Sequence, residues 1–145
     1  MSEDRFPPEK DGEIPLRLED FLRPGRVALV LWDLQKGLAG RAPGVEGITH
    51  AALRLLAAAE ARAIPVIWSR HILPPLALTP GPFLLFLMKK QKVDRPSRLR
   101  PTMQRGMADT DFLPGLAPAP HHLVLEKSQP SLFVDTPLAV RLKTL

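Results

Sequence analysis

The sequence predicts an α/β protein whose sheet is mostly parallel, and three observations support this fold class. First, residues 27–32, 66–71 and 122–126 are short runs rich in Val, Ile and Leu. Second, the run at residues 27–32 shows no polar alternation, which is typical of a strand covered on both faces in a parallel sheet. Third, an alanine-rich helical segment separates the first two runs, as in a βαβ unit. The 145 residues fit a single domain.

The N-terminal residues 1–25 are interpreted as an extended arm that ends in a turn at Pro24 and Gly25. Residues 1–20 carry seven acidic and three basic groups, so this end lacks the basic start and apolar middle of a secretory signal. No apolar run in the sequence reaches the roughly 18 residues that a membrane-spanning helix needs. We therefore expect a cytoplasmic protein without membrane contact.

The first strand, at residues 27–32, leads into Asp33 and a glycine-rich loop. A helix is expected at residues 50–63, because Leu and Ala recur there at helical spacing and Thr49 can serve as its N-cap. The chain then turns into the second strand, at residues 66–71, which ends in the triplet Ser-Arg-His.

Residues 72–120 are interpreted as a long proline-rich and basic excursion that covers the fold, because they contain nine prolines. An apolar piece at residues 83–88 is long enough for one or two helical turns. Residues 89–105 carry seven basic groups and one Asp, which fits a solvated loop, a contact with an anionic substrate, or a nucleic-acid surface. This run has no aromatic residue for base stacking, so nucleic acid is the partner that we expect least.

The third strand, at residues 122–126, has Lys127 at its C-terminal end. A final helix is expected after Thr136, which is a good N-cap, with Pro137 at the first helical position. Leu138, Leu142 and Leu145 then fall on one helical face.

The candidate site lies where the strands end, because ligands of open α/β sheets bind outside the carboxyl ends of the strands. Asp33 ends the first strand, residues 69–71 end the second, and Lys127 ends the third. Alone, Asp33 also fits a loop-capping carboxylate and Lys127 an exposed lysine. At corresponding positions, however, they form a plausible Asp–Lys pair that would act as catalytic groups.

Three blocks in this order resemble the isochorismatase-like cysteine hydrolase family. The blocks are VALVLWDLQKG, HAALRLLAAAEARAIPVIWSRH and LEKSQPSLFVDTPL. The resemblance implies a three-layer α/β/α fold of Rossmann type with a six-stranded, mostly parallel sheet. It also implies that the C-terminal strands of this sheet are missing from the 145 residues, so that the single domain at residues 1–145 is incomplete.

The resemblance further implies hydrolysis of a small amide or an isochorismate-type substrate by an Asp–Lys–Cys set, in which Asp33 and Lys127 match the acid and the lysine. The sequence contains no cysteine, so we do not expect cysteine-dependent turnover from these residues. Four further residues are predicted to contact the substrate: Gln35, Trp68, His71 and Phe133. Core packing remains open for Trp68, strand termination for His71, and a role at the entry to the last helix for Phe133.

The four histidines show none of the spacing with Asp that metal-binding relatives use, so no metal and no cofactor are expected. A small-molecule substrate and a homo-oligomer are the expected partners, the latter because the first strand would otherwise form an open apolar edge. The alternative is a non-catalytic α/β module that acts through binding or oligomerisation.

Overall fold

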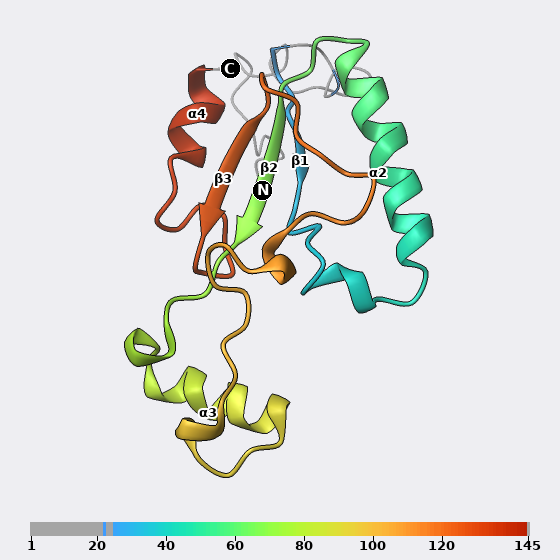
Figure 1. The fold of residues 1–145 in the computed structure, drawn as a ribbon. Coiled ribbons are helices and arrows are strands. Elements are labelled where there is room, and N and C mark those ends of the chain that lie inside the picture. The colour runs from blue at the N-terminus through green and yellow to red at the C-terminus, as the bar shows by residue number, and fades with distance from the viewer. Residues whose placement is uncertain (1–21, 23–24, 145) are drawn as a thin grey trace, which may run out of the picture.

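A three-stranded parallel sheet with a helix on each face forms the body of the protein (Figure 1). The structure is a computed structural model, and it describes residue 22 and residues 25–144. The expected N-terminal arm therefore lies almost wholly outside the described residues. The strands pair in the order β1-β2-β3, and their bounds are Leu29–Leu31, Val66–His71 and Leu123–Lys127. This arrangement confirms the predicted α/β class and parallel sheet.

The strand register decides which side chains share a face of the sheet. Ser69 lies beside Leu125, and His71 lies beside Lys127. Because side chains alternate along a strand, these four residues point to one face and Trp68 points to the other. Helix α2 (Val45–Glu60) covers the face of Trp68, and α4 (Leu138–Thr144) covers the face of Ser69 (Figure 1).

Each face has its own apolar core. The larger core packs α2 against the sheet and includes Leu31, Ala52, Ala59, Val66, Trp68, Phe112, Leu113 and Leu116. The smaller core packs the C-terminal segment against the sheet through Ile67, Leu125, Leu132 and Leu138. Strand β1 has a partner on one side only among the described residues, and Leu29 and Val30 are half-buried rather than fully covered.

Helix α2 starts earlier than expected, and the prediction that Thr49 caps it is wrong. Its N-cap is Gly44, whose φ of 74° is accessible to glycine at no steric cost, and the helix begins at Val45. The Thr49 hydroxyl instead donates to the carbonyl of Val45 within the helix, at 3.0 Å. The second cap is confirmed, because the Leu138 N–H donates to Thr136 Oγ1 at 3.2 Å. On α4, Leu138 is buried but Leu142 is 40% exposed.

The excursion at residues 72–120 has two parts that lie in different places relative to the sheet (Figure 1). Its first part projects from the body and contains α3 (Gly81–Gln91), which is longer than the one or two turns expected from the sequence. Its second part returns along the body, where Phe112 packs on the Trp68 ring with centroids 4.9 Å apart. Among the described residues, no helix is both long and apolar enough to cross a membrane.

Candidate active site

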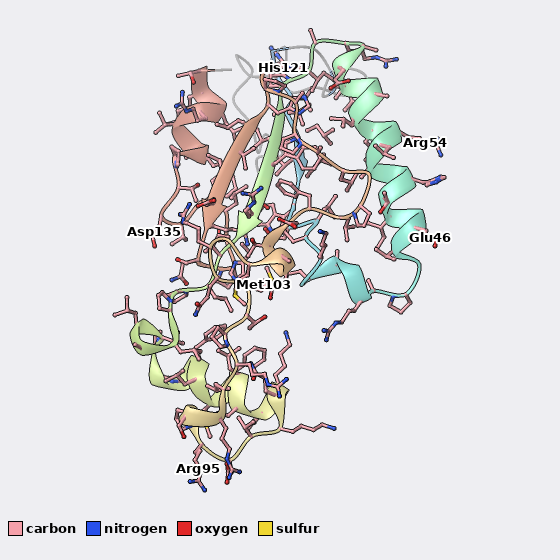
Figure 2. The ribbon with its side chains drawn as sticks, in the orientation of Figure 1. Glu46, Arg54, Arg95, Met103, His121 and Asp135 are labelled. Atoms are coloured by element: carbon pink, nitrogen blue, oxygen red, sulfur yellow. The ribbon has the colours of Figure 1, made fainter. Side chains whose placement is uncertain are left out.

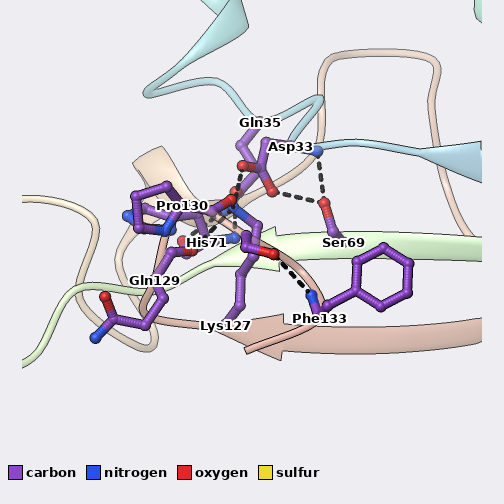
Figure 3. A network of polar contacts seen from close by, with 9 residues as sticks. Asp33, Gln35, Ser69, His71, Lys127, Gln129, Pro130 and Phe133 are labelled. Atoms are coloured by element: carbon purple, nitrogen blue, oxygen red, sulfur yellow. Dashed lines mark hydrogen bonds and ion pairs between the residues drawn. The ribbon is translucent and has the colours of Figure 1, made fainter. Parts of the chain in front are cut away.

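Asp33 and Lys127 meet at the carboxyl end of the sheet (Figure 3). Lys127 Nζ lies 2.6 Å from Asp33 Oδ2, and the two side chains are only 1% and 17% exposed. Asp33 follows β1 and Lys127 ends β3, so the strand order places one on each side of β2. The pair is therefore a charge-assisted hydrogen bond that is largely shielded from water.

The ammonium group of Lys127 has a further set of acceptors in the segment that follows β3. Besides Asp33, it donates to the backbone carbonyl of Pro130 at 3.0 Å and to that of Gln129 at 3.3 Å. Three N–H donors thus face three oxygens, which is the full capacity of a lysine. This coordination fixes the ammonium in place, and its charge lies 5.4 Å from the centre of the half-exposed Trp32 ring.

Ser69 binds Asp33 from the middle strand, a role that sequence reasoning missed. Its hydroxyl donates to Asp33 Oδ1 at 2.6 Å and accepts the backbone N–H of Asp33 at 2.8 Å. Asp33 has a φ of 53°, a left-handed conformation that is uncommon for a residue other than glycine. The two contacts hold this conformation and leave Asp33 with one oxygen on Ser69 and the other on Lys127. The available signal was a serine directly after the apolar part of the strand, at the start of the triplet Ser-Arg-His.

Gln35 is fully buried and ties three segments together. Its Nε2 donates to the carbonyls of His71 and Thr110, at 3.1 and 2.9 Å, and its Oε1 accepts the backbone N–H of His71 at 2.6 Å. Both amide protons are used, so the geometry favours a positioning role for Gln35 over the predicted contact with a substrate.

His71 lies at the end of β2, beside Lys127 in the register. Burial lowers the pKa of His71 below its usual value, the Lys127 ammonium lowers it further, and the Asp33 carboxylate opposes both effects. Its Nδ1 is buried and has no hydrogen-bond partner in the described part of the chain. At neutral pH the ring is therefore uncharged, and it remains a candidate for contact with a substrate.

A cavity of about 530 Å³ opens beside Lys127 and is large enough for a small molecule. It is lined by residues from the end of β3, from the excursion and from the segment before α4, among them Arg105, Glu126, Ser128 and Asp135. Glu126 forms ion pairs with Arg105 and, at 3.7 Å, with Arg70. The site thus joins a buried charged pair to an open hollow whose wall has both apolar and charged residues.

Comparison with known families gives a match over almost the whole described chain. An isochorismatase domain model matches residues 27–145. The chain belongs to the isochorismatase family. This result confirms the family that the three sequence blocks indicated, and the observed sheet agrees with the fold of that family.

Solved structures of the isochorismatase family resemble this fold. A cysteine hydrolase from Pseudomonas syringae pv. phaseolicola aligns with a TM-score of 0.65 and 23% identity, over 84% of this chain and 55% of that one. An isochorismatase family protein from Desulfovibrio vulgaris aligns with a TM-score of 0.63 and 21% identity, over 81% and 60%. One from Burkholderia thailandensis aligns with a TM-score of 0.57 and 26% identity, over 83% and 59%.

The chain thus spans between half and two thirds of the length of these three structures. A comparison with proteins of curated function gave no match.

Two of the residues predicted to contact a substrate of this isochorismatase-family chain differ sharply in exposure. Trp68 is 0% exposed, lies on the α2 face and donates its Nε1–H to His122 Nδ1 at 3.1 Å. It therefore belongs to the core, on the face opposite to Ser69. Phe133 is 57% exposed, and its backbone N–H donates to Ser131 Oγ at 3.2 Å, close to the Lys127 network (Figure 3).

One group of potential metal ligands lies together among the described residues, namely Glu60, His121 and His122. Its chemistry does not fit a metal ion. His122 Nδ1 accepts N–H bonds from Trp68 and Ala119, which assigns the proton of the neutral ring to Nε2. A metal at Nε2 would have to displace that proton. Metal-binding histidines show the opposite pattern, in which the second ring nitrogen donates to an acceptor.

Proposed function

We propose that Asp33 and Lys127 are the proton-transfer and electrostatic groups of a hydrolytic site that acts on a small amide or an isochorismate-type enol ether. The observation that carries this proposal is the 2.6 Å contact between two shielded charges from different strands. Such pairs occur at active sites because the scaffold holds both groups in place before the substrate arrives.

In this proposal Asp33 moves the proton and Lys127 supplies the positive charge. Ser69 and Lys127 each hold one carboxylate oxygen, so the orientation of Asp33 is set before reaction. The ammonium stabilises negative charge that develops nearby, whether on a nucleophile or on the substrate oxygen. The hollow beside Lys127 supports a substrate of small-molecule size, and His71 and Phe133 are not among the residues that line it.

The nucleophile of the amide route is the part of the proposal that the sequence does not supply. The Asp–Lys–Cys set implied by the family resemblance needs a thiol, and the 145 residues contain no cysteine. For an amide, the proposal therefore requires a thiol from outside these residues. The enol-ether route places no such requirement on the chain, since the resemblance implies that some isochorismate-cleaving members work without the cysteine.

The test is a turnover assay of the 145-residue protein with small amides and with enol ethers, before and after Asp33→Asn. General acid–base groups contribute about 10²- to 10⁴-fold to rates, so the variant should lose at least about 10²-fold. Asp111→Asn is the matched control, because Asp111 is an exposed acid that pairs with Lys36. Turnover that survives Asp33→Asn as well as it survives Asp111→Asn would contradict the proposal.

A non-catalytic binding module is the second candidate, and two observations favour it. The thiol is absent from the sequence, and β1 has an unpaired edge among the described residues. This candidate predicts no turnover of any substrate, together with ligand binding that Asp33→Asn leaves unchanged. A homo-oligomer and a cytoplasmic location remain predictions.

A further inference from the structure

A second polar cavity lies where the projecting part of the excursion meets the body. Its volume is about 530 Å³, and it shares no lining residue with the cavity beside Lys127. Figure 2 shows this projecting part, with Arg95 at its tip and Met103 where it joins the body. Five charged side chains contribute to the cavity wall: Arg41, Lys90, Arg98, Arg100 and Asp109.

The charges of this cavity are not balanced. Arg98 is paired with Asp94 at 3.1 Å. Arg41, Lys90 and Arg100 have no acidic group within ion-pair distance in the part of the chain that the structure describes. Three exposed cations that line one hollow repel each other and attract an anion.

The cavity wall is held in shape by hydrogen bonds. The Gln91 side chain donates to the Arg100 carbonyl and accepts the Arg100 backbone N–H, both at 2.9 Å. These bonds fix Arg100 against the end of α3 that carries Lys90. On the body side, the Gly37 N–H donates to the Asp109 carbonyl at 2.8 Å. A Cβ on Gly37 would lie 2.9 Å from that carbonyl oxygen, so the close approach requires glycine. A site with fixed walls loses little entropy when a ligand binds.

Asp109 adds a requirement for a hydrogen-bond donor. Its Oδ2 accepts the Thr102 hydroxyl and the Met103 N–H, both at 2.8 Å. Its Oδ1 is buried and has no partner among the described residues. A buried acceptor without a donor is unfavourable. A ligand that satisfies this wall must therefore carry negative charge for the three cations and one O–H for Asp109.

We propose that this cavity binds a small phosphate-type anion that retains one P–OH group. Arg41, Lys90 and Arg100 bind its charged oxygens, and Asp109 Oδ1 accepts its hydroxyl. Hydrogen phosphate has both features at neutral pH, whereas sulfate has the charge without the proton. The cavity has no aromatic side chain in its wall, so it lacks the stacking surface of a single-stranded nucleic-acid site.

The test is calorimetric titration of the 145-residue protein with inorganic phosphate at pH 7, with sulfate at equal ionic strength as the comparison. We expect saturable binding of one phosphate, and an affinity for sulfate that is at least about tenfold lower, since a lost hydrogen bond to a charged group exceeds 1.4 kcal/mol. Lys90→Ala and Arg100→Ala should each weaken phosphate binding by about tenfold. Lys89→Ala is the matched control, because Lys89 precedes Lys90 on α3 but does not line the cavity.

Three results would overturn the proposal: equal affinity for phosphate and sulfate, a loss in Lys89→Ala as large as in Lys90→Ala, or no saturable phosphate binding. Oligonucleotides whose affinity rises with length while phosphate does not saturate would instead assign the surface to nucleic acid. Binding needs no turnover, so this result is separate from the proposed hydrolysis. Asp33→Asn should lower turnover by at least about 10²-fold and leave phosphate binding unchanged.

Discussion

Each end of the sheet buries a polar side chain, but the two side chains have opposite hydrogen-bond partners. The one at the carboxyl end donates to acceptors, and the one at the amino end accepts from donors. At the carboxyl end, the ammonium of Lys127 donates to three oxygens, one of which belongs to the carboxylate of Asp33. At the amino end, the His122 side chain is equally buried, at 2% exposed, yet its Nδ1 accepts two N–H bonds. Its Nε2 lies 3.3 Å from Glu60, whose side chain is 45% exposed, without the geometry of a hydrogen bond.

This difference shows that the partners of a buried polar group, rather than its burial, indicate what it does. Lys127 is surrounded by acceptors, which stabilise a full positive charge at the edge where ligands of α/β sheets bind. His122 instead accepts two N–H bonds at Nδ1, one from Trp68 and one from Ala119. The arrangement around Lys127 holds a charge where a ligand can bind, whereas the hydrogen bonds of His122 connect Trp68 to the loop before β3.

Lys127→Met should have the largest effect of the changes considered. Removing one partner of a buried ion pair leaves an uncompensated charge, which costs about 3–5 kcal/mol of unfolding free energy. The loss should appear as a lower midpoint in urea-induced unfolding. The double variant Lys127→Met with Asp33→Asn should lose less than the single variant, because it no longer buries an unpaired carboxylate. If the double variant loses more, the cost comes from the lost packing of the lysine stem.

His122→Leu should have the next largest effect. The change leaves the buried Nε1–H of Trp68 without an acceptor inside the protein, which costs about 1–3 kcal/mol, whereas the N–H of Ala119 belongs to a half-buried residue and adds less. His121→Leu is the matched control, because His121 is the exposed neighbour and such surface changes cost within about 0.5 kcal/mol. Equal midpoints of urea unfolding for the two variants would mean that His122 is not a structural acceptor.

The strands and the charged pair were accessible from the sequence because they depend on local patterns. Strand β2 was predicted at its observed bounds, since it starts directly after the turn at Pro65 and ends with the triplet Ser-Arg-His. Asp33 and Lys127 were placed together because parallel strands bring their carboxyl ends to one edge. The strand arrangement alone was enough for this inference, without any estimate of how strongly Asp33 and Lys127 attract each other.

The remaining features depend on tertiary contacts that no local pattern encodes. Ser69 and Asp33 are 36 residues apart, and a serine in a strand has many alternative partners. Gly44 rather than Thr49 begins α2, since both residues are acceptable caps and the preceding loop decides between them. Helix α3 extends further than expected because Pro82 occupies its first turn, where proline stabilises a helix instead of ending it.

The pH dependence of His71 is the third test of the comparison, since His71 adjoins the charged pair and His122 does not. Its pKa is lowered in the folded protein from the ordinary value of 6.5. The unfolded chain therefore binds the proton more readily than the folded protein, so stability is greatest above pH 6.5 and falls as the pH decreases toward the folded pKa. His71→Asn should remove this part of the pH slope in urea unfolding between pH 7.5 and 5. An NMR titration midpoint for His71 at or above 6.5 would contradict the prediction.

The smallest effect is expected for the exposed pair of Lys36 and Asp111, which provides a scale for the buried one. Their Nζ–Oδ2 distance is 3.0 Å, close to that of Lys127 and Asp33, but the side chains are 45% and 58% exposed. Water screens this pair, so a double-mutant cycle with Lys36→Ala and Asp111→Ala should give a coupling of about 0.2–1 kcal/mol. Added salt should reduce that coupling further, whereas it should change the coupling of Lys127 and Asp33 much less. Equal salt dependence of the two couplings would mean that solvent reaches Lys127 and Asp33 as freely as it reaches the surface pair.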